Sequence, residues 1–387
     1  MVISGNQQFL RTINRLAVLR AVRLNAGISR VKLAEILSLT RPTIGNLVDE
    51  LITDGWLSEE KLGPTGALGR RPVALHMDDA SRILVGADIN NQRVICIATT
   101  LGGEIREMSV TPTHSDQAEV ALDILARQTS SIWQRLSAAN CRVSAMGIGV
   151  PGPVDTESGT LRYSDNTGWR NLPVRFMLEE RLKQAGMPAF PVLVQRAVGC
   201  VALYHFEYER RAEEEPLLYV HVGHAVTAAL ATRYTLIQGH RGMTGAIGHV
   251  TMDPQGPLCN CGKRGCANML ATLRAVQDAT GRPASEFRAA ALAGDPVLSR
   301  ELRIAGKHFG TLLHNLSMQF DPARLFVGGP AFQSGQEFLS SARETFNGLY
   351  EPSGLTPPRI EVVRQDANAV ALGAATSALY ALVRPLS

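Results

Sequence analysis

The first 55 residues carry apolar side chains at helical spacing, interrupted by two short polar turns. One amphipathic helix is predicted over residues 12–27, and a second begins after Ser29, a residue type that caps helices well. The second helix is expected to bury the apolar set Val31, Leu33, Ala34 and Leu37. The third helical pattern is the clearest, because its apolar residues form an uninterrupted stripe: Ile44, Leu47, Val48, Leu51 and Ile52.

Two short strand patterns follow the third helix, separated by a glycine-rich loop. The strands are Trp56-Leu57 and residues 73–77, and the loop covers residues 63–72. Three helices followed by a two-stranded hairpin with a long loop are typical of a winged helix-turn-helix. We therefore expect residues 1–77 to form a winged helix-turn-helix DNA-binding domain.

Beyond residue 82 the chain alternates buried strand patterns with helices. A strand, a second strand that turns back beside it, and then helices occur in this order twice. Repetition of this kind predicts an α/β protein with two related lobes around a cleft. The patterns are strands at 83–87, 94–98 and 145–150 with a helix at 118–136, and later strands at 217–222 and 226–234.

The length of 387 residues agrees with several domains, since one domain commonly holds about 100–200 residues. The first lobe is expected at residues 78–193, completed by a C-terminal helix at 367–387. The second lobe is expected at residues 194–366, with a metal site and a surface for oligomerisation.

Composition argues against a disordered or membrane-spanning chain. Hydrophobic residues make up 45% and charged residues 19%, as in ordinary globular proteins. The longest nearly apolar stretch, residues 369–383, has 15 residues, fewer than the roughly 20 that cross a bilayer. The N-terminus lacks the basic and apolar regions of a secretory signal. The sequence therefore predicts a cytoplasmic protein without membrane insertion.

The positive charge is concentrated near the N-terminus. The whole chain has a net charge of +4, whereas residues 1–48 contain seven basic residues and one acidic residue, Glu35. A basic head on a neutral body is typical of proteins that bind polyanions, although charge alone also fits a solvated basic helix. The basic residues are Arg11, Arg15, Arg20, Arg23, Arg30, Lys32 and Arg41.

The third helix is the candidate for reading DNA. Its outer face begins with Arg41, Thr43 and Asn46, and Gly45 permits close approach to a duplex. Arg suits guanine, Asn suits adenine, and Thr suits phosphate or a thymine methyl group. In the loop between the strands, Arg70 and Arg71 are expected to reach phosphate or the minor groove. A three-helix protein-docking domain is the alternative.

One imidazole and three thiols predict a metal site. His249, Cys259, Cys261 and Cys266 supply the four nitrogen and sulfur ligands that Zn²⁺ takes in closed structural sites. Unliganded thiols or a redox pair are the alternatives. The remaining cysteines are expected to be buried thiols in apolar surroundings: Cys96, Cys141 and Cys200.

Motifs spread over most of the chain resemble the ROK family of repressors, open reading frames and kinases. The resemblance implies a two-lobed actin/hexokinase-like (ribonuclease H-like) fold and a homodimer or homotetramer. With the N-terminal head, it points to the repressor branch, in which binding to a DNA operator is controlled by a sugar, a sugar phosphate or a protein partner. The motifs are residues 150–155 (Val-Pro-Gly-Pro-Val-Asp), 245–249, 259–266, 321–329 and 372–375.

The chain departs from the kinase pattern of that family. The first phosphate turn, usually Asp-Ile-Gly-Gly-Thr, reads Asp-Ile-Asn-Asn-Gln at residues 88–92, and the second is altered at residues 223–227. The run Asn-Asp-Ala-Asn with the catalytic base is matched by residues 195–198, Gln-Arg-Ala-Val. Arginine cannot act as a base at neutral pH. We therefore expect no enzyme activity, with an ATP-dependent sugar kinase as the alternative.

The sugar-binding positions are altered as well. Ala246 and Asn268 stand where the family's sugar binders have glutamates, whereas Asn166 and His249 remain. Arg196 suggests an anionic effector, such as a sugar phosphate or sugar acid. A vestigial pocket, with regulation by a protein partner or by expression level, is an equal alternative.

Taken together, the sequence predicts a transcriptional regulator, most simply a repressor of genes for carbohydrate metabolism. Its dimer is expected to bind a pseudo-palindromic operator in double-stranded DNA. Structural zinc is the expected cofactor.

Overall fold

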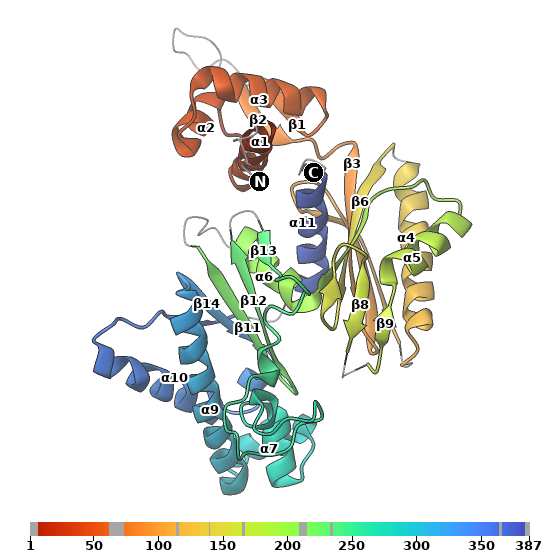
Figure 1. The fold of residues 1–387 in the computed structure, drawn as a ribbon. Coiled ribbons are helices and arrows are strands. Elements are labelled where there is room, and N and C mark those ends of the chain that lie inside the picture. The colour runs from red at the N-terminus through yellow and green to blue at the C-terminus, as the bar shows by residue number, and fades with distance from the viewer. Residues whose placement is uncertain are drawn as a thin grey trace. The chain divides into compact units, whose positions relative to one another are not determined.

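The computed structural model describes residues 7–61, 73–113, 116–138, 140–164, 167–208, 215–232, 235–363 and 366–383. The chain divides into two compact units (Figure 1). The first unit contains Met1–Arg210 and Val370–Ser387, and the second contains Arg211–Ala369. Within the described ranges, no helix is both long enough and apolar enough to cross a membrane.

The N-terminal part of the first unit is a small helical head, defined here as residues 7–61 and 73–77. Its short helices begin at side-chain caps: the Ser29 hydroxyl accepts from the Lys32 amide, and the Thr40 hydroxyl accepts from the Thr43 amide. The head contains α1 (Gln7–Leu24), α2 (Arg30–Leu37), α3 (Arg41–Thr53) and the antiparallel strands β1 (Leu57–Lys61) and β2 (Val73–Met77).

The apolar stripe of α3 is buried as predicted except at Ile52, which is half-buried, and one prediction for α2 is wrong. Ile44, Leu47, Val48 and Leu51 are all buried. In α2, Leu33 and Ala34 turn inward, whereas Val31 is 45% exposed. Residues two positions apart in an α-helix are separated by about 200° around its axis, so Val31 and the buried Leu33 point to opposite sides of α2.

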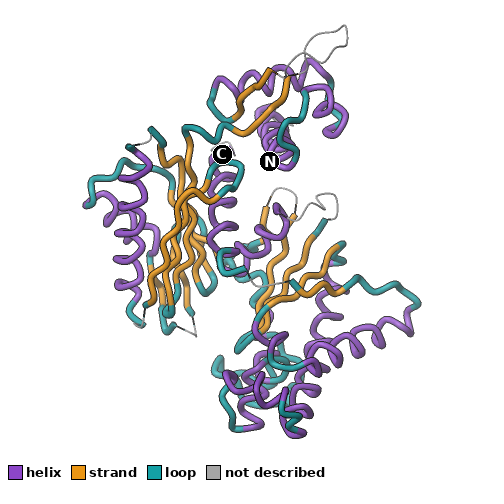
Figure 2. The backbone as a smooth tube through the Cα atoms, turned by 180° about the vertical axis from the view of Figure 1, so that it is seen from behind, coloured by secondary structure: helices purple, strands orange, loops and turns teal. Residues whose placement is uncertain are grey.

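The rest of the first unit is a five-stranded sheet with helices on both faces (Figure 2). The strand order is β10-β6-β3-β4-β5, with β3 parallel to β6 and antiparallel to β4. The strands are β3 (Arg82–Ile89), β4 (Arg93–Thr99), β5 (Ile105–Pro112), β6 (Arg142–Val150) and β10 (Val192–Arg196). A smaller sheet contains β7 (Val154–Asp155), β8 (Thr160–Tyr163) and β9 (Arg170–Leu172).

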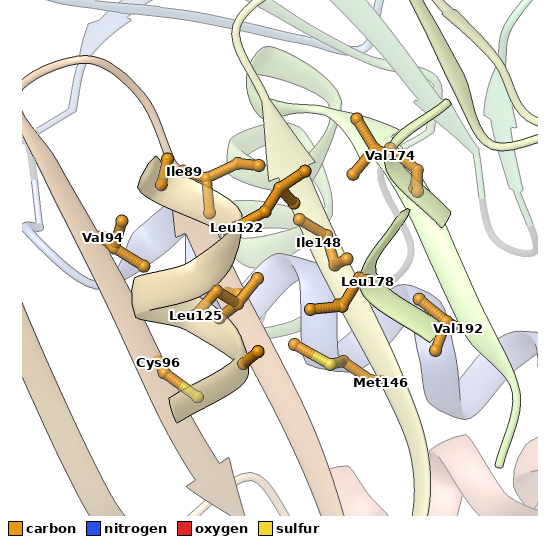
Figure 3. Close-up of a cluster of buried hydrophobic side chains, with 14 of the residues drawn as sticks. Ile89, Val94, Cys96, Leu122, Leu125, Met146, Ile148, Val174, Leu178 and Val192 are labelled. Atoms are coloured by element: carbon orange, nitrogen blue, oxygen red, sulfur yellow. The ribbon is translucent and has the colours of Figure 1, made fainter. Parts of the chain in front are cut away.

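One face of the large sheet is covered by α4 (Ala118–Ser137) and α5 (Val174–Gln184). Leu122 and Leu125 of α4 and Leu178 of α5 point toward Ile148 and Met146 of β6 (Figure 3). These side chains belong to a buried apolar cluster that forms the core on this side of the sheet. The alternating strand residues that point to this face are therefore nearly all apolar.

The opposite face is covered by α11 (Ala369–Val383) and α6 (Ala197–Tyr208), and glycines permit the close contact. A Cβ atom at Gly86 or Gly147 of the sheet would lie 2.0 Å or 1.9 Å from a carbonyl oxygen of α11. A Cβ atom at Gly373 of α11 would lie 1.8 Å from the Cys200 carbonyl oxygen of α6. Sheet, α11 and α6 therefore form closely stacked layers.

The head and the first sheet share one apolar core. A single cluster joins buried residues of all three helices of the head to Leu84 of β3, Ala145 of β6 and Leu379 of α11. Leu101, in the turn after β4, belongs to the same cluster. The head is therefore part of the first unit rather than a separate body.

The division between the units differs from the predicted boundary at residues 193 and 194. Gln195 and Arg196 continue the parallel pairing of β10 with β6, and α6 packs on the first sheet. Residues 194–208 thus lie in the first unit, because their backbone hydrogen bonds and packing are made there. The C-terminal helix also lies in the first unit from Val370 onward.

The second unit repeats the topology of the first. Its strand order is β13-β12-β11-β14-β15, with β11 antiparallel to β12 and parallel to β14. The first strand of each repeat thus pairs with an antiparallel neighbour on one side and a parallel one on the other. The strands are β11 (Leu217–Val222), β12 (Val226–Thr232), β13 (Thr235–Ile237), β14 (Arg324–Gly328) and β15 (Ile360–Val362).

Helices of the second unit enclose an apolar core that contains Phe309, Phe338 and Phe346. The two longest helices pack against each other along their length. The helices are α7 (Leu273–Thr280), α8 (Phe287–Leu292), α9 (Pro296–Phe320) and α10 (Gln336–Tyr350), with 3-10 turns η1 (Ile247–His249), η2 (Ala267–Met269), η3 (Ala284–Glu286), η4 (Pro330–Gln333) and η5 (Glu351–Ser353).

Substitution of Gly147 by alanine tests the close stacking of α11 on the sheet. We expect Gly147→Ala to lower the free energy of unfolding by about 1–3 kcal/mol, because the new methyl group overlaps the Ala374 backbone. Urea denaturation followed by circular dichroism measures the change. The control is Gly348→Ala, at a position in α10 where a Cβ atom meets nothing within 4 Å. Equal stability of the two variants would contradict the stacking.

Candidate functional site

The N-terminal end of α3 is exposed. Arg41 and Asn46 are exposed, and Thr43 is half-buried. The Thr43 hydroxyl lies 2.8 Å from the Thr40 hydroxyl, so it is already engaged in the helix cap. A Cβ atom added to Gly45 would meet nothing within 4 Å, so this side of α3 is open to a partner. The free backbone N–H groups of a helix N-terminus favour a negatively charged ligand.

Several basic residues of the head are paired with acidic residues of the head itself. These ion pairs link α1 and α2 to α3 and β1, so they help to orient α3. They also neutralise positive charge that a count of the basic residues would assign to the binding of a polyanion. The pairs are Arg11–Glu50, Arg15–Glu50 (3.4 Å), Arg15–Asp54 (2.6 Å), Arg30–Asp49 (2.6 Å) and Arg30–Glu59 (2.7 Å).

Arg41 differs from these residues, because it has no ion pair among the residues that the structure describes. It lies beside the open N-terminal end of α3. The positive potential at this end therefore comes from Arg41 and from the helix itself. Arg70 and Arg71, which the sequence also assigns to DNA binding, lie outside the described residues.

Arg20 and Arg23 do not belong to an exposed basic face. Arg20 is only 8% exposed and forms an ion pair with Glu207 of α6 at 3.1 Å. Arg23 donates to the Tyr208 hydroxyl of the same helix. The helical periodicity could have placed Arg20 on the buried side of α1, one turn after Leu16, but it could not identify the partners in α6.

The predicted metal ligands lie together in the second unit. The ligand atoms of His249, Cys259, Cys261 and Cys266 are all within 4.8 Å of one another. Cys259 Sγ lies 3.7 Å from His249 Nδ1, and Cys261 Sγ lies 3.5 Å from Cys266 Sγ. A tetrahedral ion with sulfur ligands at 2.3 Å requires sulfur–sulfur distances of about 3.8 Å. The arrangement is therefore compatible with a single metal ion.

Tight turns bring these ligands together. His249 lies in η1, and Cys266 directly precedes η2. Short antiparallel bridges, Thr251 with Cys266 and Leu258 with Arg264, close the loop between them. At Gly265, with φ +61°, a Cβ atom would lie 1.5 Å from the Asp253 carbonyl oxygen, so only glycine fits there.

The chemistry of the donor set also fits a cation. Cys259 and Cys266 are buried, whereas Cys261 is exposed. Burial and the neighbouring thiols of Cys261 and Cys259 together raise the pKa of the Cys266 thiol to about 12. Clustered thiols of this kind resist ionisation together unless a cation neutralises them. The four residues could therefore hold a divalent metal ion as thiolates and neutral imidazole.

The cysteines outside the cluster agree only in part with the prediction of buried thiols. Cys96 and Cys200 are buried, and burial raises the pKa of the Cys96 thiol to about 12. Cys141 is half-buried, and its thiol donates to the Ala80 carbonyl oxygen. Within the described residues, all six cysteines are free of disulfide bonds.

The turn after β3 is closed by its own side chain. Asn90 Oδ1 accepts from the backbone amides of Gln92 at 2.9 Å and Arg93 at 3.0 Å. These amides are thereby occupied, whereas a phosphate-binding turn presents free amides to its ligand. Asp88, at the end of β3, is buried, and burial raises the pKa of its carboxyl group to about 6.

Asn268 has a structural role in the second unit. Its Oδ1 atom accepts from the Val226 amide at 2.9 Å, which joins η2 to the beginning of β12. A Cβ atom at Gly248 would lie 2.2 Å from the same Oδ1 atom, so the side chain is closely surrounded. The position is therefore used for packing and backbone hydrogen bonding.

Of the residues predicted to bind an effector, the two that the structure describes lie in different units. Arg196 ends β10 in the first unit, and burial lowers the pKa of its guanidinium to about 10, so it remains charged at neutral pH. His249 lies in the second unit with the cysteine cluster. Asn166 lies outside the described residues.

Comparisons with known proteins agree with this fold. The model of the ROK family matches residues 84–380. The xylose repressor of Caldicellulosiruptor bescii is 26% identical over 393 residues, which covers 95% of this chain and 96% of the relative.

Two solved structures are similar as well. A ROK family transcriptional regulator, described as a homolog of the E. coli MLC protein, has a TM-score of 0.77 at 21% identity and covers 96% of this chain and 97% of its own. The ROK hexokinase of Thermus thermophilus has a TM-score of 0.66 at 27% identity and covers 78% of this chain and 99% of its own. These likenesses confirm the predicted actin/hexokinase-like fold of the body.

Removal of one thiol tests the metal site. We expect purified protein to retain about one equivalent of a divalent metal, and Cys261→Ala to lose most of it, because three donors hold such an ion less tightly than four. Elemental analysis of the dialysed protein measures the content. Cys141→Ala, outside the cluster, is the matched control and should retain the metal. Full metal content in Cys261→Ala would exclude Cys261 as a ligand.

Proposed function

The chain belongs to the ROK family, and from this premise we propose that it is a DNA-binding transcriptional regulator that represses genes of sugar metabolism. The observation that carries the proposal is the extent of similarity. The xylose repressor aligns with 95% of this chain, whereas the hexokinase structure covers 78%. The family model begins at residue 84, after the head. A head of this kind accompanies the repressor rather than the kinase.

The head is proposed to act as a winged helix-turn-helix. Helix α3 is its recognition helix, with Arg41, Thr43 and Asn46 toward the major groove. The segment between β1 and β2, with Arg70 and Arg71, is the wing that contacts phosphate or the minor groove. A homodimer or homotetramer would present two such heads to a pseudo-palindromic operator.

Phosphoryl transfer is not part of the proposed function. The amides of the turn after β3 are occupied by Asn90, which argues against a phosphate-binding role for this turn. Arg196 stands in the run that matches the kinases' catalytic base, and a guanidinium cannot accept a proton at neutral pH. The chain therefore keeps the kinase fold without the groups that phosphoryl transfer requires.

The metal is proposed to be structural Zn²⁺. Its ligands would be His249, Cys259, Cys261 and Cys266, a set of one imidazole and three thiolates that suits closed tetrahedral zinc sites. The ion would supply a fixed cross-link for the loop between η1 and η2. No catalytic role is proposed, because a closed site leaves no position for a substrate.

The effector is proposed to be an anionic sugar derivative that Arg196 binds. A permanently charged guanidinium offers paired donors that suit a carboxylate or a phosphate. The position of Arg196 at the C-terminal end of β10 supports this assignment, because ligands of open α/β sheets bind at the carboxyl ends of their strands. A protein partner in place of a sugar derivative is the second candidate.

Substitution of Asn46 tests whether α3 reads the DNA bases. We expect Asn46→Ala to weaken binding to the cognate operator by about 1–3 kcal/mol and to leave binding to random duplex unchanged. Fluorescence anisotropy with an operator selected from random oligonucleotides measures both affinities. Arg71→Ala should instead weaken both and reduce the dependence on salt, since a phosphate contact carries no sequence information. Equal losses on both duplexes for Asn46→Ala would remove its role in base readout.

Substitution of Arg196 tests whether this residue binds an anionic effector. Calorimetric titration with D-xylose, D-gluconate and D-glucose 6-phosphate should give heat only with the anionic compounds, and Arg196→Ala should abolish it, because the charged donor is lost. Arg181→Ala, which removes a half-buried arginine paired with the exposed Asp123, is the control. Binding that persists in Arg196→Ala would contradict the assignment.

A further inference from the structure

The head is joined to the first sheet through the last turn of α6. Arg20 of α1 and Glu207 of α6 form an ion pair in which both side chains are almost fully buried. The Arg20 guanidinium also lies 4.5 Å from the ring centre of Phe206. From α11, the Tyr380 hydroxyl donates to Glu207. Three helices thus meet at one carboxylate.

A second arginine of α1 reinforces the contact. Arg23 lies over the Tyr208 ring at 4.9 Å and donates to its hydroxyl. It also contacts the Gly102 carbonyl oxygen at 3.4 Å and the Thr376 hydroxyl at 3.5 Å. Gly103, which follows Gly102, has a φ of +94°, and a Cβ atom there would clash with both Tyr208 and Arg23. The surrounding turn is therefore shaped to fit this pair.

A buried ion pair by itself adds little to the stability of a protein. Removing two charges from water is costly, and apolar side chains of similar size usually stabilise a core at least as well. A buried pair does impose a defined geometry, because each charge must keep its partner within reach. Burial raises the pKa of the Glu207 carboxyl group, and Arg20 and Arg23 oppose that shift and favour the charged form. The contact therefore fixes how α1 lies on α6.

The other end of α6 begins at the proposed effector residue. The helix starts at Ala197, directly after Arg196, and ends at Tyr208. Its 12 residues span about 18 Å at 1.5 Å per residue. Gly199 and Cys200 near its start and Phe206 and Glu207 near its end are buried. A short helix held on several sides moves as a rigid body, so a shift at one end is passed to the other.

Helix α1 also holds the recognition helix. Its ion pairs through Arg11 and Arg15 reach Glu50 in the last turn of α3 and Asp54, the residue that caps its C-terminal end. A shift of α1 relative to α6 therefore changes the position of α3 as well. The chain of contacts runs from Arg196 through α6 to α1, and from α1 to α3.

We propose that α6 couples the effector residue to the DNA-binding head, with Glu207 and Arg20 as the positioning pair that transmits its movement. The inference rests on the proposed function, since it presumes that α3 binds DNA and that Arg196 marks the effector site. It assigns to Arg20 and Glu207 a role in regulation rather than in DNA contact. Tyr380 and Arg23 hold the pair in place.

A double-mutant cycle without any effector tests the coupling. Arg196→Ala is combined with the wild-type pair and with the neutral pair Arg20→Met/Glu207→Gln, which leaves no charge buried alone. The measurement is the Kd for the selected operator duplex by fluorescence anisotropy. Urea denaturation verifies that each variant is folded at the assay temperature.

We expect Arg196→Ala to change the operator Kd by at least about fivefold when the Arg20–Glu207 pair is present. When the pair is neutral, the same substitution should change the operator Kd by less than about twofold, because the effects of independent sites add to within about that range. Arg181→Ala, on a partly exposed pair in the same unit, should have no effect in either background.

Two outcomes overturn the coupling: an Arg196→Ala effect of the same size in both backgrounds, or no effect in either. A purely structural pair would lower stability and leave the effect of Arg196→Ala unchanged. Failure of the proposed function is a different result, because wild-type protein would then select no duplex at all. Hydrogen exchange gives a second readout: Arg196→Ala should speed exchange in α1 only when the pair is intact.

Discussion

The apolar core shared by the head and the first sheet is the constraint on which the rest of the structure depends. Buried side chains of α1, α2 and α3 pack with Leu84, Ala145 and Leu379 in one cluster. A head attached in this way cannot swing on a linker without exposing apolar surface, at roughly 25 cal/mol for each Å². Control of DNA binding must therefore act through the first unit as a whole or through a small shift at the contact with α6.

The stacked layers of the first unit and the polar turn after β3 depend on different residues. Stacking of α11 and α6 on the sheet requires Gly86, Gly147 and Gly373, which leave room for helix backbone. The polar turn after β3 contributes nothing to that stacking. Asn90 can therefore close the turn on its own amides without disturbing the layers. A scaffold of this kind remains available for regulation.

Some basic residues of the head pair within the protein and others stay exposed, and the composition alone does not distinguish the two groups. Arg11, Arg15 and Arg30 orient α3 through exposed or partly exposed ion pairs, which contribute little to stability. Arg20 and Arg23 contact Glu207 and Tyr208 of α6 instead. Arg41 remains at the open end of α3. The exposed surface of the head therefore carries less positive charge than the sequence count indicates.

The sequence alone determined the helices of the head, the two repeated α/β sheets and the four candidate metal ligands. Those features are local: apolar periodicity defines which face of α3 is buried, and close spacing brings Cys259, Cys261 and Cys266 together. Only the tertiary structure decided that Arg20 meets Glu207 and that β10 and α6 belong to the first unit. Residues that far apart in the chain meet through packing of whole elements, and local patterns carry no information about which partner each element finds.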